Sequence, residues 1–385
     1  MSRRWVQLAT FAAYLPSAAL PVLAHRPDAP GGSLDPSVLV VPFCLTFAAA
    51  FPLWGRLADR IAPERVILVA LGLAAAAGAL VAAAPGETVL ILARAAQGAA
   101  AAGVPPAAQA ALARVSAEHE TGRALSPMMI AVAFAVLGGP ALAAPLGDVA
   151  GWAATALVLG CAAPVALVLV AAPPVSALRR SGESRPRAPK ARYADARGVH
   201  AGWLVSAFVL AGHWTVLTRI AEAVGADGLG AGTDWSGVAP LAGALGLPLV
   251  VLAARAGDRA GPRRPMVAAL CAGALGFALA AAASTVAMFI AAAGTGLAVY
   301  WAYLPVVAAQ VQRSAGADAR GRAAGGLYAS MWCAAAAAGA LASLAPSWRV
   351  VLAGAGLSWA AGAVVAARRF ITAPALGRAE AVAPA

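Results

Sequence analysis

The chain has 385 residues, of which 62% are hydrophobic and 11% are charged, and its mean hydropathy is +0.79. Soluble domains carry about 25% charged residues, so this composition excludes a soluble globular protein and predicts an integral membrane protein. The net charge of +12 is spread over separate short segments, which excludes a nucleic-acid-binding surface. The four cysteines lie in different apolar runs without ligand spacing, so we expect no metal site and no cofactor.

Twelve apolar runs lie between charged or Gly/Pro-rich breaks, and most have the roughly 20 residues that cross a bilayer. The sequence therefore predicts an all-α membrane protein with twelve transmembrane helices. The first run has a secretory signal as its alternative, but the repeat described below gives it a partner in the second half. The runs cover residues 5–24, 37–54, 66–84, 88–112, 125–147, 152–172, 201–224, 235–254, 266–284, 286–310, 324–344 and 348–367.

The basic residues indicate how the chain is oriented. All but four of the 28 Lys and Arg residues fall in the N-terminal tip, in alternate loops or in the tail; the exceptions are Arg26, Arg94, Arg219 and Arg349. Because positively charged loops stay in the cytoplasm, we expect a multi-pass protein of the plasma (inner) membrane with both termini cytoplasmic. The basic, Pro-rich stretch 173–200 is expected to be a flexible cytoplasmic linker.

Two loops repeat at an offset of 199 residues. RLADRIAPER (56–65) matches RAGDRAGPRR (255–264) at five of ten positions, and the same offset aligns Arg114, Gly122 and Arg123 with Arg313, Gly321 and Arg322. Agreement of two loops on one offset indicates a duplication, as in transporters built from parallel repeats. We expect two parallel six-helix halves, residues 1–172 and 201–367, with the linker 173–200 between them and a cytoplasmic tail, 368–385.

These loops resemble the major facilitator superfamily. GRLADRIAPER is similar to the family's loop between helices 2 and 3, and RAGDRAGPRR to its copy between helices 8 and 9, although Ala62 and Glu64 depart from the pattern. Asp59 matches the family's gating Asp, and the resemblance implies that it contacts the positive end of a neighbouring helix in one conformation. The residues matched as a gating motif are Gly55, Asp59, Arg60, Arg65, Asp258 and Arg259.

Helices 4, 5 and 7 carry further similarity. ILARAAQGAAAAG (91–103) resembles the helix 4 signature through Arg94, Gln97 and Gly98. In helix 5, the pair Gly139-Pro140 resembles the antiporter signature, although alanines replace its second Gly pair; these small residues are expected to serve close helix packing. Helix 7, GHWTVLTRIAEAVGA (212–226), resembles the drug:proton antiporter branch, which is usually uncharged where this chain has an Arg and a Glu.

The charged residues within the spans need partners, because each costs about 2.5–3.5 kcal/mol at the bilayer centre. Arg219 and Glu222 are three positions apart and share a stripe with Thr215 and Thr218, so a local pair is one arrangement. The family's cavity is lined by helices 1, 4, 7 and 10, and we expect an Arg94–Glu222 bridge at its outer mouth, with Glu222 as the proton site. In the alternative, both side chains extend to the interface without a function.

Other side chains of helices 7 and 10 are candidates for the pathway. A histidine side chain can titrate near physiological pH, so His213 either carries protons or only packs. Tyr300 and Trp301 lie near the middle of their helix, where aromatic rings either line a cavity for apolar or cationic compounds or fill the space between helices.

The motifs favour transport over catalysis, because the sequence has no phosphate-binding loop and no nucleophile motif. We expect a monomeric secondary transporter, not an enzyme, and the resemblance of helices 5 and 7 favours proton-coupled efflux of a small organic compound. The alternative is a proton-coupled importer of a small anionic metabolite, with Arg94 and Arg219 as carboxylate ligands. A transport-inactive sensor or a membrane enzyme on the same fold is a remote alternative.

Overall fold

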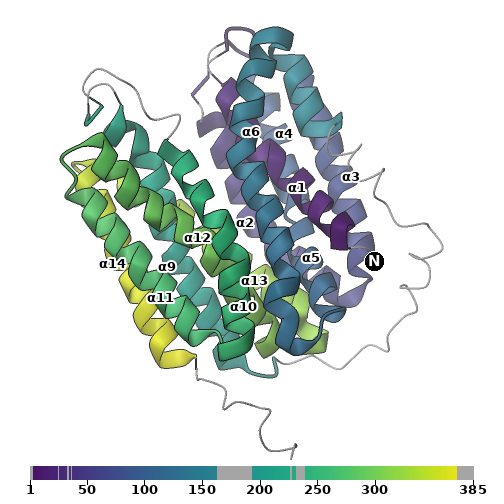
Figure 1. The fold of residues 1–385 in the computed structure, drawn as a ribbon. Helices are drawn as coiled ribbons and strands as arrows, with labels where there is room; N and C mark the ends of the chain where they lie inside the picture. The colour runs from purple at the N-terminus through teal and green to yellow at the C-terminus, as the bar shows by residue number, and fades with distance from the viewer. Residues whose placement is uncertain are drawn as a thin grey trace, which may run out of the picture.

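The computed structural model describes residues 3–24, 26–32, 34–35, 37–162, 193–225, 228–230 and 239–370. Two groups of helices stand side by side in Figure 1, and we call them the N-half and the C-half. The N-half contains α1 (Arg3–Ala19), α2 (Ser37–Arg60), α3 (Pro63–Ala82), α4 (Glu87–Ala101), α5 (Val104–Arg114) and α6 (Thr121–Leu157). The C-half contains α9 (Ala196–Val224), α10 (Leu247–Ala260), α11 (Arg263–Ala281), α12 (Val286–Ala315), α13 (Arg320–Ser343) and α14 (Trp348–Arg369).

Eleven segments of the described chain are long and apolar enough to cross a membrane. One of them, Thr121–Cys161, has 41 residues, which at 1.5 Å per residue is about 60 Å, or twice the apolar thickness of a bilayer. At Gly151 the backbone leaves the helix with φ of 76°, and the next turn, η3 (Val158–Ala162), packs back against α3. The chain therefore bends between the predicted fifth and sixth helices, although residues 163–172 of the sixth lie outside the described residues. The all-α membrane fold is confirmed, with eleven candidate spans in the described part of the chain.

The predicted fourth helix is not continuous. It divides into α4 and α5 at Ala102 and Gly103, directly before Pro105 and Pro106. Two successive prolines donate no backbone hydrogen bond, so the carbonyls one turn earlier lose their partners and the helix breaks. Periodicity alone did not register this break, because the residues on both sides are apolar.

Two predicted boundaries also differ. The expected linker ran to residue 200, whereas α9 already begins at Ala196; residues 173–192 of that linker, and 371–385 of the tail, lie outside the described residues. Residues 235–238 of the expected eighth helix, 235–254, lie outside the described residues, and the rest begins as a 3₁₀ segment, η4 (Ala239–Gly246), before α10 continues to Ala260. Gly246 lies so close to the Ala298 carbonyl of α12 that a side chain would not fit there.

The two halves meet through a few helix pairs. α13 of the C-half packs against α2 and α5 of the N-half, while α6 packs against α10 and α12. The short turns η1 (Leu20–Leu23), η2 (Glu118–Glu120) and η5 (Ala317–Ala319) connect or extend neighbouring helices. In Figure 1 the contacts between the two halves lie toward the bottom, near the start of α13 and the end of α10.

Candidate functional site

At one end of the molecule, which we call the closed end, α2 meets the start of α13. Asp59 accepts hydrogen bonds from the backbone N–H groups of Gly321 at 2.7 Å and Arg322 at 3.0 Å. Its carboxylate also pairs with the Arg322 guanidinium at 3.3 Å and is only 8% exposed. The first N–H groups of a helix have no partner within the helix and carry the positive end of its dipole. Asp59 therefore binds a helix start of the other half.

The same contact recurs with the halves exchanged. Asp258, near the end of α10, accepts hydrogen bonds from the backbone N–H groups of Gly122 at 3.0 Å and Arg123 at 2.9 Å, at the start of α6. It also pairs with Arg313 at 2.7 Å, and its side chain is 4% exposed. At the offset of 199 residues, Asp258 is the repeat partner of Asp59, and Gly321 is the repeat partner of Gly122. The sequence repeat therefore corresponds to two reciprocal contacts between the halves.

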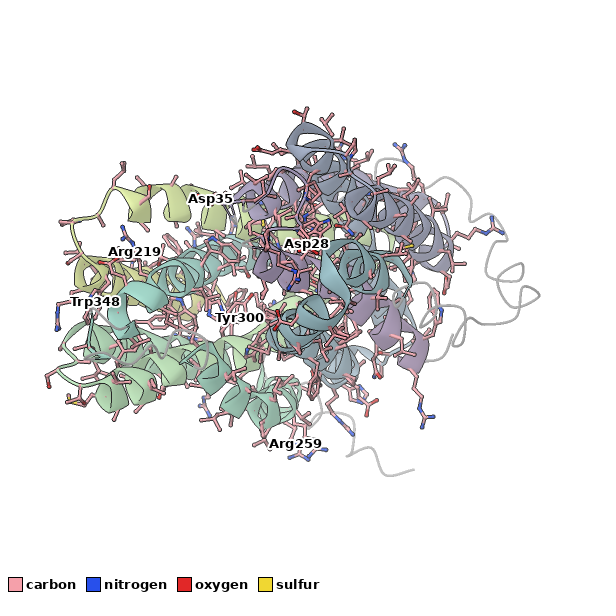
Figure 2. All side chains as sticks on the ribbon, turned by 90° about the horizontal axis from the view of Figure 1, so that it is seen from above. Asp28, Asp35, Arg219, Arg259, Tyr300 and Trp348 are labelled. Atoms are coloured by element: carbon pink, nitrogen blue, oxygen red, sulfur yellow. The ribbon has the colours of Figure 1, made fainter. Side chains whose placement is uncertain are left out.

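Glycines permit the close approach at the closed end. A Cβ atom on Gly55 would lie 2.5 Å from the carbonyl oxygen of Gly321, and a Cβ on Gly321 would overlap the carbonyl of Gly55. Two helices that touch through their backbones place the carboxylate one turn further along within reach of the N–H groups. The remaining motif side chains, Arg60, Arg65 and Arg259, are exposed at this end, and Figure 2 labels Arg259.

A second set of contacts joins the halves next to these carboxylates. Gln109 of α5 donates a hydrogen bond to the Tyr328 hydroxyl of α13 at 2.7 Å, and Gln312 of α12 donates to Gln109 at 3.4 Å. The Tyr328 ring stacks on Phe51 with centroids 5.1 Å apart. Sequence reasoning missed this cluster, because neutral amides and a tyrosine inside apolar helices carry no motif.

A pocket lies between the halves, and most of the large side chains that line it are aromatic. It has about 580 Å³ of space not filled by atoms, including the part open to solvent. Figure 2, which looks down on Figure 1 from above, shows Tyr300 between the two groups of helices. Side chains of α1, α6, α9, α12 and α13 line it, among them Tyr14, Met129, Leu210, His213, Trp214, Tyr300, Trp301, Tyr328 and Trp332.

Three of the predicted pathway residues come together in this pocket. His213 of α9 stacks on Tyr300 of α12, with ring centroids 3.9 Å apart and planes 20° from parallel. Trp301 lies edge-on to Tyr300 at 5.2 Å. All three side chains are buried, and His213 is 6% exposed. The imidazole is thus held by two helices of the C-half at the boundary with the N-half.

Arg94 is buried within the N-half. Its Nε donates to the Leu39 carbonyl at 2.9 Å and its Nη1 to the Gln97 side chain at 2.6 Å, while the guanidinium lies 4.6 Å from the centre of the Phe43 ring. Gln97 in turn reaches the Gly160 carbonyl at 3.4 Å. The charge of Arg94 is therefore stabilised by a backbone oxygen, a side-chain amide and an aromatic face. None of the six ion pairs between described residues includes Arg94.

The predicted packing residues lie at close helix crossings. A Cβ atom on Gly98 of α4 would lie 2.7 Å from the Thr46 hydroxyl of α2, and one on Gly139 of α6 would lie 3.2 Å from the Ala19 amide nitrogen. Pro140 lies inside α6 next to that second crossing. These positions bring α2 against α4 and α1 against α6.

Arg219 and Glu222 lie at the opposite end of the molecule, which we call the open end, and not in the aromatic pocket. Their side chains pair at 2.5 Å. Arg219 also donates to the carbonyls of Ala342 at 2.5 Å and Ala345 at 3.4 Å, at the end of α13, and Glu222 accepts from the Trp348 N–H at 3.2 Å, at the start of α14. A cation at a helix C-terminus and an anion at an N-terminus match both dipoles. We call these residues the C-half clasp.

The other two residues of the predicted stripe do not extend the pathway. Thr215 is buried and donates to the Gly212 carbonyl at 2.9 Å, and it lines a separate hollow between α9, α13 and α14. The Thr218 side chain lies outside the described part of the structure. The stripe therefore faces α13 and α14, because it lies on a different side of α9 from His213.

The N-half has an equivalent clasp, formed by Arg26, Asp28, Asp148 and Trp152. Asp28 accepts the backbone N–H of Trp152 at 2.6 Å, where the sixth predicted helix begins, and Arg26 pairs with Asp28 at 2.9 Å and Asp148 at 3.0 Å. The Trp152 N–H, followed by Arg26, lowers the pKa of Asp28. Because this pKa is lowered, the stability that ionised Asp28 contributes is present above the carboxyl's ordinary pKa. It is lost as the pH falls through the lowered pKa. Figure 2 labels Asp28 on the N-half and Arg219 and Trp348 on the C-half.

The expected Arg94–Glu222 bridge is not present in this structure. Arg94 has its hydrogen-bond partners in the N-half, and Glu222, which is 41% exposed, is held by Arg219 and Trp348 in the C-half. Counting residues from the span ends placed the two side chains about 6 Å apart in depth, within reach of a long Arg, but it did not show that each has partners within its own half. The local Arg219–Glu222 pair is the arrangement observed.

Exchanging the two clasp charges, Arg219→Glu with Glu222→Arg, is expected to lower the midpoint of thermal unfolding below that of either single variant. The exchange keeps an ion pair but puts the wrong charge at both helix ends, each worth about 0.3–1 kcal/mol. Midpoints are measured on purified protein in detergent, with Glu87→Gln, in the first turn of α4, as a control with a smaller shift. Recovery of the wild-type midpoint by the double variant would show that only the ion pair matters.

Comparisons with known proteins agree with this geometry. A family model described as Major Facilitator Superfamily matches residues 7–340, whereas no curated protein sequence matches the chain. Among solved structures, the human organic anion transporter MFSD10 (TETRAN) has a TM-score of 0.72 at 15% identity, covering 94% of this chain and 99% of its own. FucP in the outward conformation has a TM-score of 0.71 at 12% identity, covering 96% and 99%.

A bacterial homologue of the iron transporter ferroportin, in an outward-facing state, has a TM-score of 0.72 at 15% identity and covers 95% of this chain and 98% of its own. At these identities the structures show a shared fold and nothing about the substrate. The family model covers far more than half of the chain, including both copies of the repeated loop. The chain therefore belongs to the major facilitator superfamily and is a multi-pass membrane transporter.

Proposed function

We propose that this chain exports a small organic compound by alternating access, coupled to protons. The observation that carries the proposal is the aromatic pocket between two halves that are hydrogen-bonded to each other at the closed end. Breaking the two reciprocal contacts there while the open end closes would expose the pocket to the other side. The resemblance of helices 5 and 7 to the drug:proton antiporter branch supports export as the direction of transport.

We further propose that the closed end faces the cytoplasm. The loops at this end, which contain Arg60, Arg65, Arg259 and Arg264, are rich in arginine, and loops of this kind remain inside. The conformation described is then closed toward the cytoplasm. Both termini lie on the cytoplasmic side of the plasma (inner) membrane in this orientation.

The contacts of the two candidate proton carriers favour His213 over Glu222. Glu222 was the expected site, but its charge is satisfied by Arg219 and by the start of α14, and it lies outside the pocket. His213 is the side chain among the described pocket residues that titrates near neutral pH when free. Loss of proton-driven transport in His213→Gln, with transport retained in Glu222→Gln, would agree with this assignment.

The test compares dye efflux from cells that lack their own exporters, with and without this chain. Cells that express it are expected to accumulate less of an apolar fluorescent dye, and collapse of the proton gradient with a protonophore is expected to remove the difference. The control is the double variant Asp59→Asn/Asp258→Asn. Higher accumulation in expressing cells would establish import, and efflux unaffected by the protonophore would exclude proton coupling.

A further inference from the structure

The aromatic pocket contains no charged side chain among its described lining residues. The two arginines predicted for the pathway have other partners: Arg94 is bound within the N-half, and Arg219 is bound in the C-half clasp. A carboxylate or phosphate that entered the pocket would lose its hydration without gaining an opposite charge. The pocket therefore suits a ligand without a negative charge.

The rings in the pocket form an aromatic surface shared by three helices. Trp214 of α9 and Trp332 of α13 lie at 64° with centroids 5.5 Å apart, and Tyr300 and Trp301 of α12 lie at 69°. Edge-to-face pairs leave ring faces and edges for a further flat ring to pack against. A planar aromatic molecule matches this surface better than a sugar, whose many hydroxyl groups need polar partners.

One buried polar atom beside this surface has no hydrogen-bond partner among the described residues. His213 is 6% exposed, and its Nδ1 atom has no hydrogen-bond partner among the described residues. Buried polar atoms of this kind almost always have a partner, and an unpartnered one requires an explanation. A hydroxyl group serves here whichever nitrogen carries the proton, because it both donates and accepts.

We infer that the transported compound is a neutral, flat aromatic molecule bearing a hydroxyl group, with its ring among Trp214, Tyr300 and Trp332 and its hydroxyl bound to His213. This inference names the substrate class of the proposed exporter and rests on that proposed function. The stacking of the imidazole on Tyr300, with centroids 3.9 Å apart, holds the His213 ring in one orientation for such a hydrogen bond.

Binding is tested by calorimetry on the purified full-length chain in detergent, with three related probes. 2-Naphthol is expected to bind at least tenfold more tightly than 2-naphthoate, because the carboxylate has no cation in the pocket. It is also expected to bind about three to ten times more tightly than 2-methylnaphthalene, which lacks the hydrogen bond. His213→Phe keeps a flat ring and is expected to remove this second difference.

His200→Phe is the matched control, because His200 lies on the same helix but is exposed and outside the pocket. If His213→Phe does not fold, the ligand pairs on the wild-type chain still decide the question. Tighter binding of naphthoate, equal binding of naphthol and methylnaphthalene, or no binding of naphthol would each overturn the inference. Binding as inferred without dye efflux would instead overturn the proposed function, since binding does not require transport.

Discussion

Replacing Asp258 with asparagine is expected to open the closed end. The carboxylate accepts two backbone N–H groups of α6 and the Arg313 guanidinium, with its side chain 4% exposed. Asparagine has one acceptor oxygen and no charge, so at least one N–H loses its acceptor and Arg313 loses the ion pair with residue 258. Breaking a buried pair costs about 3–5 kcal/mol, and each 1.4 kcal/mol is a factor of ten in population, so the closed-end conformation should lose at least a hundredfold in relative population.

The opening is measured as a distance between two spin labels. The labels replace Ala62, in the loop after α2, and Asp318, in the turn before α13, on a chain whose four cysteines are alanine. They report on the Asp59 side of the closed end, away from the substitution itself. Longer distances are expected in Asp258→Asn, and longer still when Asp59→Asn is added, because the two contacts involve different residues.

Glu64→Gln is the control, since it neutralises a carboxylate in the loop of the first motif. It lies at the start of α3 and should leave the distances unchanged. Unchanged distances in Asp258→Asn as well would show that apolar packing, not these hydrogen bonds, holds the closed end. A change of equal size in all three variants would point to a general effect of net charge.

The reciprocal contacts show what the sequence repeat did and did not contain. The offset of 199 aligned Asp59 with Asp258 and Gly122 with Gly321, which are both sides of each contact. It did not reveal that each carboxylate binds the helix start of the other half, because an internal repeat relates positions without saying which of them touch. The twofold arrangement of the halves supplies that information.

Side chains inside the helices were harder to predict, for a different reason. Helical periodicity indicates which residues share a face of one helix, but not which neighbouring helix that face meets. It grouped Thr215, Thr218, Arg219 and Glu222 as one stripe, but it did not show that Arg219 and Glu222 meet α13 and α14 while His213 meets α12. The Gln109–Tyr328 bond carried no signal at all, since its partners are 219 residues apart and neutral.

Replacing Arg94 with methionine is expected to abolish transport while leaving the fold almost as stable as before. The guanidinium is 0% exposed and its Nη2 has no hydrogen-bond partner among the described residues. Methionine of similar length loses the bonds to Leu39 and Gln97, each worth about 1 kcal/mol. It also removes a buried charge that costs about 2.5–3.5 kcal/mol at mid-membrane, so the two effects nearly cancel.

The charge of Arg94 adds little net stability, yet the residue is fully buried beside helices that line the pocket. A role in the transport cycle is the simplest explanation. Thermal midpoints and dye efflux are therefore measured on the same preparations of Arg94→Met, with Arg349→Met as the control. Arg349 is exposed on α14 and donates to the Ala281 carbonyl, and its replacement should leave efflux at the wild-type rate.

Arg94→Ala should unfold more readily than Arg94→Met, by about 2–5 kcal/mol, because it also leaves a cavity. Wild-type efflux by Arg94→Met would mean that the charge has no part in transport, and loss of its folded state would mean that the hydrogen bonds to Leu39 and Gln97 outweigh the cost of burying the guanidinium.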